Sequence, residues 1–209
     1  MVLKVIYLDY DDVIKEKNQI GVLGFFDGLH IAHIELIKKG VELKKQYQQQ
    51  LTVFTFEQNI RKYLNNEPFY YLTSIKDKQE ILSDIGVDIL YVFKISRPFI
   101  GLSPTEFIEK YLIHMSHLVV GFDFTYGYRS IGNVELLKSY NQFETHVLSE
   151  ISYQGEKIGS SKIREFLDHG QMALANYLLG RNYNITGRVI HGRGVGKILG
   201  FPTANIDFT

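Results

Sequence analysis

Short runs of β-branched and aromatic residues alternate with longer amphipathic segments along the first 150 residues. The apolar runs predict strands, and the segments between them, with apolar residues three or four positions apart, predict helices. This alternation is typical of βα units around a mostly parallel sheet, so these residues are expected to form one α/β domain. The expected strands are 20–26, 51–56, 89–93, 118–121 and 145–151, the last at an edge of the sheet. The expected helices are 31–46, 75–85, 104–114 and 133–141.

The pattern changes after residue 150. Residues 160–170 and 171–180 predict a hairpin of two short helices, each ended by a glycine. From about residue 183 the chain is rich in glycine and strand-like, and it is too short there to build a core of its own. We therefore expect one domain over residues 1–183 and the start of a second, incomplete domain over residues 184–209.

Charge and composition exclude several classes of protein. The 23 Lys and Arg residues balance 23 Asp and Glu residues, which gives no global support for binding a nucleic-acid backbone. The chain contains no cysteine, so any metal must bind oxygen or imidazole ligands. No apolar run approaches the roughly 18 residues that span a membrane, and the N-terminus lacks the features of a secretory signal. We expect a cytoplasmic protein that binds neither nucleic acid nor membrane, and the oligomeric state is not predicted.

The most informative segment joins the first expected strand to the first expected helix. It reads Gly24-Phe25-Phe26-Asp27-Gly28-Leu29-His30-Ile31-Ala32-His33. In an open α/β sheet, ligands bind at such strand-to-helix turns, and a helix N-terminus offers free N–H groups to phosphates. His30 and His33 are three residues apart and face the same side of the helix, where both could donate hydrogen bonds to a polyphosphate. The alternative, that the histidines only cap or pack the helix, is disfavoured by the pairing and the flanking glycines.

This segment resembles the G-x-F-D-G-x-H-x-G-H signature of the HxGH nucleotidyltransferases, and in particular of the bacterial bifunctional riboflavin kinase/FAD synthetases. Three more segments resemble motifs of that family in the same order along nearly the whole chain. Residues 119–127 resemble its V-G-x-D/N-F-x-F-G segment, residues 160–164 its S-S-T-x-I-R motif and residues 199–205 its kinase-domain G-F-P-T-A-N. Four ordered motifs are far more specific than one, so the chain is identified as a member of this family.

The resemblance implies a fold and a reaction. The fold is a Rossmann-like parallel-sheet nucleotidyltransferase domain with a C-terminal helical hairpin, followed by the start of the riboflavin kinase β-barrel. The reaction is transfer of AMP from ATP to FMN, which yields FAD and pyrophosphate, with Mg²⁺ neutralising the phosphates. The FMN phosphate attacks the α-phosphorus in line, so catalysis depends on positioning and charge stabilisation.

The resemblance also implies site residues. His30 and His33 would hold the ATP phosphates, and Arg164 would act on them from the opposite side. The other implied ATP-binding residues are Gly24, Phe25, Phe26, Asp27, Gly28, Ser160 and Ser161, and the implied FMN-binding residues are Asp123 and Phe124. Taken alone, residues 160–164 would indicate only a helix cap and a solvated helix face, and Asp123 only a turn residue.

The glycine-rich C-terminal segment invites a phosphate-loop interpretation, which fails. A Walker A loop needs glycine where His191 stands and Ser or Thr where Ile198 stands. The resemblance instead makes this segment the first strand and loop of the kinase barrel, in which Thr203 and Asn205 match the residues that bind Mg²⁺ and nucleotide phosphate in the complete domain. In isolation, residues 201–205 would indicate only a proline-containing turn. The kinase base and flavin pocket are expected beyond Thr209, so this chain is not expected to phosphorylate riboflavin.

Two departures from the family pattern leave alternatives open. Ala32 replaces the last glycine of the signature, and Gln58-Asn59 follows Phe56-Glu57 where the family has Pro-His-Pro. A catalytically weakened flavin- or nucleotide-binding paralogue is therefore the first alternative. An adenylyl- or cytidylyltransferase for another phosphorylated substrate is the second, and the motifs at residues 160–164 and 199–205 disfavour it.

Overall fold

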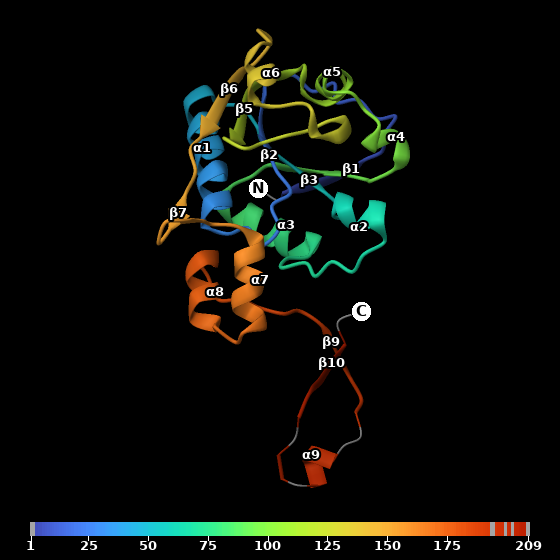
Figure 1. Ribbon diagram of the computed structural model, residues 1–209, viewed down its shortest axis with the longest axis vertical. Coiled ribbons are helices and arrows are strands. Elements are labelled where there is room, and N and C mark those ends of the chain that lie inside the picture. The colour runs from blue at the N-terminus through green and yellow to red at the C-terminus, as the bar shows by residue number, and fades with distance from the viewer. Residues whose placement is uncertain (1–2, 193–194, 199, 202, 208–209) are drawn as a thin grey trace.

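The computed structural model describes residues 3–192, 195–198, 200–201 and 203–207. Within these residues a six-stranded, entirely parallel sheet has the order β1-β4-β3-β2-β5-β6 (Figure 1). Its strands are β1 Lys4–Leu8, β2 Gln19–Leu23, β3 Leu51–Phe56, β4 Ile89–Phe93, β5 Met115–Gly121 and β6 Glu144–Leu148. The α/β prediction is confirmed, β3 and β4 have their predicted bounds, and β6 is an edge strand as expected.

The sheet differs from prediction in several places. β5 begins at Met115, before the predicted 118, and β6 spans Glu144–Leu148, where 145–151 was predicted. β1 was not predicted, although its five residues are rich in β-branched and aromatic side chains, and it forms the edge opposite β6. The strand predicted over 20–26 ends early, at Leu23. By Phe26 the chain has left the extended conformation, since this residue is left-handed with φ of 54°.

The predicted helices are present. They are α1 Ile31–Tyr47, α3 Ile75–Ile85, α5 Pro104–Phe107 with a π-helical continuation at Ile108–Leu112, and α6 Val134–Lys138. Ser74 and Ser103 start α3 and α5, each with a reciprocal capping box that satisfies otherwise free N–H groups. The sequence reading missed short elements, namely α2 Ile60–Asn65, α4 Arg97–Ile100, a 3-10 turn at Tyr128–Ser130 and the small hairpin β7 Ser152–Tyr153 with β8 Glu156–Lys157.

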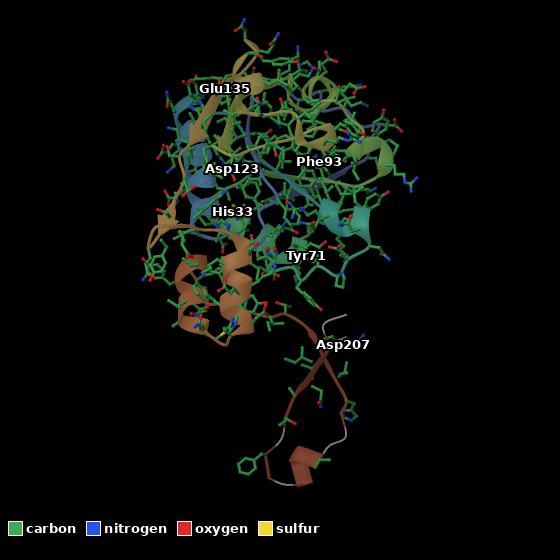
Figure 2. All side chains as sticks on the ribbon, in the orientation of Figure 1. His33, Tyr71, Phe93, Asp123, Glu135 and Asp207 are labelled. Carbon is green, nitrogen blue, oxygen red and sulfur yellow. The ribbon has the colours of Figure 1, made fainter. Side chains whose placement is uncertain are left out.

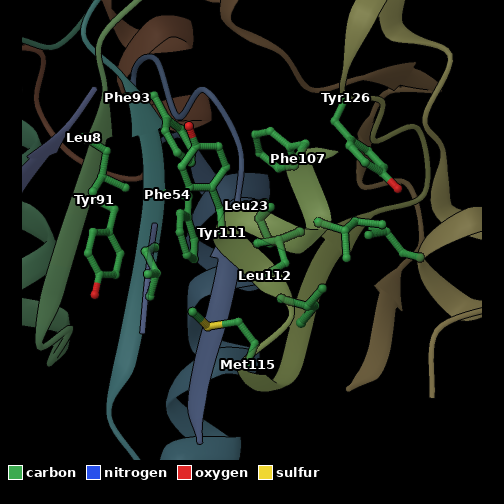
Figure 3. Close-up of a cluster of buried hydrophobic side chains, with 14 of the residues drawn as sticks. Leu8, Leu23, Phe54, Tyr91, Phe93, Phe107, Tyr111, Leu112, Met115 and Tyr126 are labelled. Carbon is green, nitrogen blue, oxygen red and sulfur yellow. The ribbon is translucent and has the colours of Figure 1, made fainter. Parts of the chain in front are cut away.

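Both faces of the sheet are covered, which explains why the central strands read as continuous apolar runs. On one face, α4, α5 and the π-helical turn contribute to an aromatic cluster, which includes Phe54, Phe93, Phe107 and Tyr111 (Figure 3). On the other face, α1 and α3 pack against a second, mainly aliphatic cluster, which includes Val22, Val53 and Leu90 of the sheet. Gly40 allows the close approach of α1, because a Cβ atom there would lie 2.7 Å from side-chain atoms of Leu51 and Val22.

The C-terminal part follows the predicted change of pattern. Helices α7 Ser160–Asp168 and α8 Met172–Leu179 form the expected hairpin and pack around Ile163, Ala175 and Leu178. Beyond them, β9 Arg188–Ile190 and β10 Asn205–Asp207 pair antiparallel, and the short helix α9 Val195–Ile198 lies between them. Figure 1 shows this second hairpin extending away from the sheet. The domain boundary at residues 183–184 stays a prediction. No helix in the described part of the chain is long and apolar enough to cross a membrane.

Candidate active site

The site lies where the strand order of the sheet reverses. From β2 the chain proceeds through β3 to β4 on one side, whereas β5 and β6 lie on the other side of β2. In open α/β sheets such a switch point leaves a crevice outside the carboxyl ends of the two strands. Here the crevice lies between the turn after Leu23 and the segment after Gly121, and residues from both line one cavity.

The turn after β2 is strained and held from several directions. Phe26 and Leu29 are buried non-glycine residues in the left-handed region, with φ of 54° and 41°. Such residues cost on the order of 1 kcal/mol or more each and persist only where their surroundings fix them. Thr73 Oγ1 accepts a hydrogen bond from Gly28 N–H at 3.0 Å. Arg181 donates to the carbonyls of Gly28 at 2.8 Å and Leu29 at 3.1 Å.

His30 and His33 form a stacked pair at the start of α1. Their ring centroids are 3.5 Å apart with planes inclined by 19°. His30 is the helix N-cap, and its Nδ1 accepts the backbone N–H of His33 at 3.4 Å. The acceptor role of Nδ1 places the proton of a neutral His30 on Nε2, which is then a donor. Capping and ligand binding are therefore compatible roles for this residue.

Both imidazoles are held in the neutral form. Burial, with a smaller contribution from the charge of Arg181, lowers the pKa of His30 to about 4. Burial and the adjacent His30 also lower the pKa of His33 well below its usual value. His33 Nδ1 is buried and has no hydrogen-bond partner among the described residues. At neutral pH the pair therefore offers N–H groups, not full positive charges, to a ligand.

Asp27 joins three segments beneath this turn. It is 1% exposed, and its Oδ1 accepts the N–H of Leu72 at 2.9 Å and of Thr73 at 3.3 Å. Its Oδ2 forms an ion pair with Arg164, which also donates from Nε to Tyr70 O at 2.8 Å. Burial raises the pKa of Asp27, and the charge of Arg164 opposes that rise. The structure thus brings Asp27 and Arg164 together in a clamp, and their predicted contacts with ATP stay predictions.

The serine motif begins α7 next to the same turn. Ser160 Oγ donates to the carbonyl of Asp27 at 2.7 Å, whereas Ser161 is exposed. Ser160 lines a cavity of about 260 Å³ that contains the histidine pair. The lining residues of this first cavity are Leu23, Gly24, Phe26, His30, Ala32, His33, Leu36, Gly121, Phe122, Asp123, Phe124, Leu148, Ser149, Glu150, Ile151, Lys157, Ile158, Gly159 and Ser160.

A second cavity of about 680 Å³ adjoins the first and is strongly aromatic. Nine Phe and Tyr side chains line it, namely Phe25, Phe54, Phe56, Phe93, Phe99, Phe107, Phe124, Tyr126 and Tyr128. Leu23, Gly24, Asp123 and Phe124 line both cavities, so the two spaces meet at these residues. Asp123 and His33, both labelled in Figure 2, line the first cavity. A flat aromatic ligand suits the second cavity, and a polar, phosphate-bearing ligand suits the first.

The sequence analysis missed two cations, Lys157 in the first cavity and Lys78 beneath the turn at Phe25. Lys157 lines the first cavity and pairs with Asp123. Lys78 is 2% exposed, and its Nζ donates to Phe25 O at 2.8 Å and to Thr55 Oγ1 at 3.1 Å. Burial lowers the pKa of Lys78 to about 8. The burial of Lys78 could have been predicted, because this residue lies on the apolar face of α3, four residues before the buried Leu82.

The departures from the family motifs have visible places in the structure. Ala32 lines the first cavity beside His33. Asn59 caps α2, accepting from the N–H groups of Arg61 at 2.9 Å and Lys62 at 3.3 Å. Ile60, Arg61 and Leu64 of this helix line the second cavity, so Asn59 caps the helix that forms part of its wall.

The two residues predicted for the kinase motif lie elsewhere. Asn205 is in β10, opposite Ile190 of β9, and Thr203 is in the preceding loop. Both side chains are exposed. Within the described part of the chain, neither belongs to the lining of the two cavities.

Comparisons with known proteins agree with these observations. The family model for FAD synthetase matches residues 13–162, and the model for riboflavin kinase matches residues 179–209. The bifunctional riboflavin kinase/FMN adenylyltransferases of Listeria monocytogenes and Bacillus subtilis are 38% and 37% identical over 98% and 93% of this chain. The chain spans 68% and 64% of those relatives. A solved structure described as a macrolide-efflux protein from Streptococcus pneumoniae aligns with a TM-score of 0.86 at 28% identity, covering 98% of this chain and 69% of that one.

Proposed function

The chain belongs to the FAD synthetase family, and from that premise we propose that residues 1–183 transfer AMP from ATP to FMN, giving FAD and pyrophosphate. The observation that carries the proposal is the meeting of two unlike cavities at Asp123 and Phe124. ATP fits the first cavity with its phosphates at the start of α1, and the flavin ring fits the aromatic second cavity. The reacting phosphates then meet where the two cavities join.

The chain's own groups supply positioning and charge stabilisation. A phosphate oxygen of FMN attacks the α-phosphorus of ATP, a new P–O bond forms, and the bond to the departing pyrophosphate breaks. His30 and His33 donate N–H bonds to the phosphates beside the free N–H groups of α1, where such donors strengthen as charge develops. Lys157 adds a positive charge to the same cavity. For Arg164, the contact with Asp27 supports a positioning role beneath the turn.

We also propose Mg²⁺ as a cofactor of this reaction. Asp123 and Glu150 line the first cavity, and carboxylates combined with substrate phosphates are the ligands that Mg²⁺ prefers. These two residues would hold the ion, which when bound neutralises phosphate charge. ATP as a substrate favours a cytoplasmic location, with small molecules as the partners of the site.

The proposal extends to a second activity only for the whole protein. Relatives that the chain spans by about two thirds are named as riboflavin kinases as well as FMN adenylyltransferases. Thr203 and Asn205 are the proposed ligands of Mg²⁺ and nucleotide phosphate in that kinase domain. We expect no riboflavin phosphorylation by the 209-residue chain itself.

The test is incubation of the purified chain with ATP, MgCl₂ and FMN, with FAD and pyrophosphate followed by chromatography. Riboflavin replaces FMN in a parallel reaction. FAD from FMN, with nothing formed from riboflavin, supports the proposal. Binding of ATP and FMN without FAD formation would instead favour the paralogue that has lost catalysis. Use of another phosphorylated acceptor in preference to FMN would overturn the flavin assignment.

A further inference from the structure

Three side chains with metal-binding atoms converge on one face of β5 and β6. The strand register places His117 opposite Glu144, and His146 follows two residues later on β6. Cross-strand partners and residues two apart along a strand share a face of the sheet. The backbone hydrogen-bond ladder therefore fixes the relative positions of all three residues.

The separations of their ligand atoms suit one small cation. His117 Nδ1 lies 3.2 Å from His146 Nε2. One carboxylate oxygen of Glu144 lies 3.5 Å from His117 Nδ1, and the other lies 3.7 Å from His146 Nε2. Zinc binds nitrogen and oxygen at about 2.0–2.2 Å, so the ligand atoms of a tetrahedral zinc site are about 3.3–3.5 Å apart. Small side-chain shifts are enough to bring all three atoms within bonding distance of a common centre.

From this arrangement we propose that His117, Glu144 and His146 bind a divalent ion of the zinc class, with a fourth coordination position open. Two imidazoles and one carboxylate favour Zn²⁺, Co²⁺ or Ni²⁺ over Mg²⁺, which prefers an all-oxygen set. A hydrogen bond between His117 and His146 would explain why their rings are close, but it would not explain why the Glu144 carboxylate lies beside both rings. Its oxygens are farther from both rings than a usual N–H···O hydrogen bond, although this largely exposed side chain is free to turn toward solvent.

A fourth residue supports the orientation of one ligand. Tyr47, the last residue of α1, packs against His117 with ring centroids 4.2 Å apart and planes tilted by 32°. Groups that hold a metal-binding imidazole in place strengthen binding, because less freedom is lost when the ion arrives. An ion at this position would tie the edge strand β6 to β5.

The proposed ion site is separate from the active site. His117 precedes Gly121 by four residues along β5, which corresponds to about 13 Å of extended strand. Asp123 and the two cavities lie beyond Gly121, at the carboxyl end of the strand. An ion bound by His117 would thus not contact the phosphates of ATP.

The test uses the untagged, metal-free chain titrated with Co²⁺, whose visible absorption reports its coordination, followed by displacement with Zn²⁺. We expect one bound equivalent with a low-coordinate spectrum and no displacement by Mg²⁺. His146→Ala and Glu144→Gln should each weaken Co²⁺ binding by about tenfold or more, since even the loss of an outer supporting group costs 10–100-fold. Glu144 is largely exposed, so Glu144→Gln keeps the fold while removing a ligand.

Two variants serve as matched controls. His169→Ala removes an exposed histidine outside the cluster, and His33→Ala removes one ring of the other histidine pair. Both should retain the Co²⁺ spectrum and affinity of the wild type. At the same Zn²⁺ concentration, the Tm of the wild type should rise by more than that of Glu144→Gln. The proposal is overturned if the wild type gives no Co²⁺ spectrum, if Glu144→Gln binds as tightly as wild type, or if His33→Ala abolishes the signal.

Discussion

The two close histidine pairs of this protein, at opposite ends of the sheet, differ in what they present to a ligand. His30 and His33 stack face to face, and His30 uses Nδ1 to cap the helix. His117 and His146 instead direct ring nitrogens toward each other, with a carboxylate beside them. In our proposals the first pair donates hydrogen bonds to an anion, and the second provides lone pairs to a cation. Ring orientation and the nearest charged group, more than the presence of two histidines, decide which ligand such a pair suits.

The largest expected difference between the two ends of the sheet is in the contribution of a carboxylate, Asp27 or Glu144, to stability. Asp27→Ala leaves Arg164 without its buried partner and removes the acceptor of two N–H groups, so we expect a loss of about 3–5 kcal/mol in the free energy of unfolding. Glu144→Ala, at an exposed carboxylate, should change it by less than about 0.5 kcal/mol in metal-free buffer. Urea unfolding of both variants measures the difference. Equal losses would show that Asp27 is not the clamp described above.

The histidines themselves separate catalysis from structure. His33→Ala removes the N–H donor that we propose for the transferring phosphates, so kcat for FAD formation should fall by about 10²–10³-fold, with the Kd for FMN little changed. His146→Ala is the matched control at the other end of the sheet. In buffer that contains Mg²⁺ but no zinc-class ion, its kcat should stay within about twofold of the wild-type value. An equal loss in FMN binding for His33→Ala would contradict its assignment to the phosphates.

The neutral state of the first pair predicts a pH dependence of stability. Burial lowers the pKa of His30 to about 4, so between that value and about 6.5 the unfolded chain binds a proton that the folded chain does not. Stability from this residue is fully present above pH 6.5 and is lost as the pH falls toward 4, by about 3 kcal/mol in total. Unfolding of wild type and His30→Asn between pH 4 and 7 measures this contribution. Relative to His30→Asn, the wild type should lose about 3 kcal/mol of stability between pH 7 and pH 4, and parallel curves would rule out the lowered pKa.

Ala32 gives the smallest expected effect and tests whether its methyl group crowds the first cavity. Ala32→Gly should change the KM for ATP by less than about tenfold, because one methyl group is worth about 1 kcal/mol in a binding site. The glycine should also cost up to about 1 kcal/mol of stability near the helix start. Steady-state kinetics of the variant provide the measurement. A rise in kcat of a hundredfold or more would mean that Ala32 has largely disabled the site.

Local signals in the sequence account for most of what was predicted correctly. The bounds of α3 follow from Ser74, which caps its start, and from Gly86, which ends it in a left-handed conformation with φ of 98°. β1 was missed because it is a single short run far from its partner β4 in the sequence, although Val5 and Ile6 carried a strand signal.

Long-range pairing accounts for what sequence reading could not supply. Arg181 contacts Gly28, 153 residues earlier, and no local pattern marks that contact. His117 and Glu144 become neighbours only through the register of two strands. The clamp of Asp27 and Arg164 likewise joins positions 137 residues apart, so the motif reading gave both residues a ligand contact and missed their contact with each other.

The hydrogen bonds from Arg181 to the strained turn affect when that turn can form during synthesis. During synthesis every strand of the sheet leaves the ribosome before residue 181, so β2 and α1 can form while the turn between them still lacks this support. The left-handed conformations of Phe26 and Leu29 are costly until the arginine arrives. Nascent chains released before α8 and Arg181 emerge should therefore carry the strands of the sheet but an unsupported turn after β2. Maturation of the site is thus tied to completion of the helical hairpin.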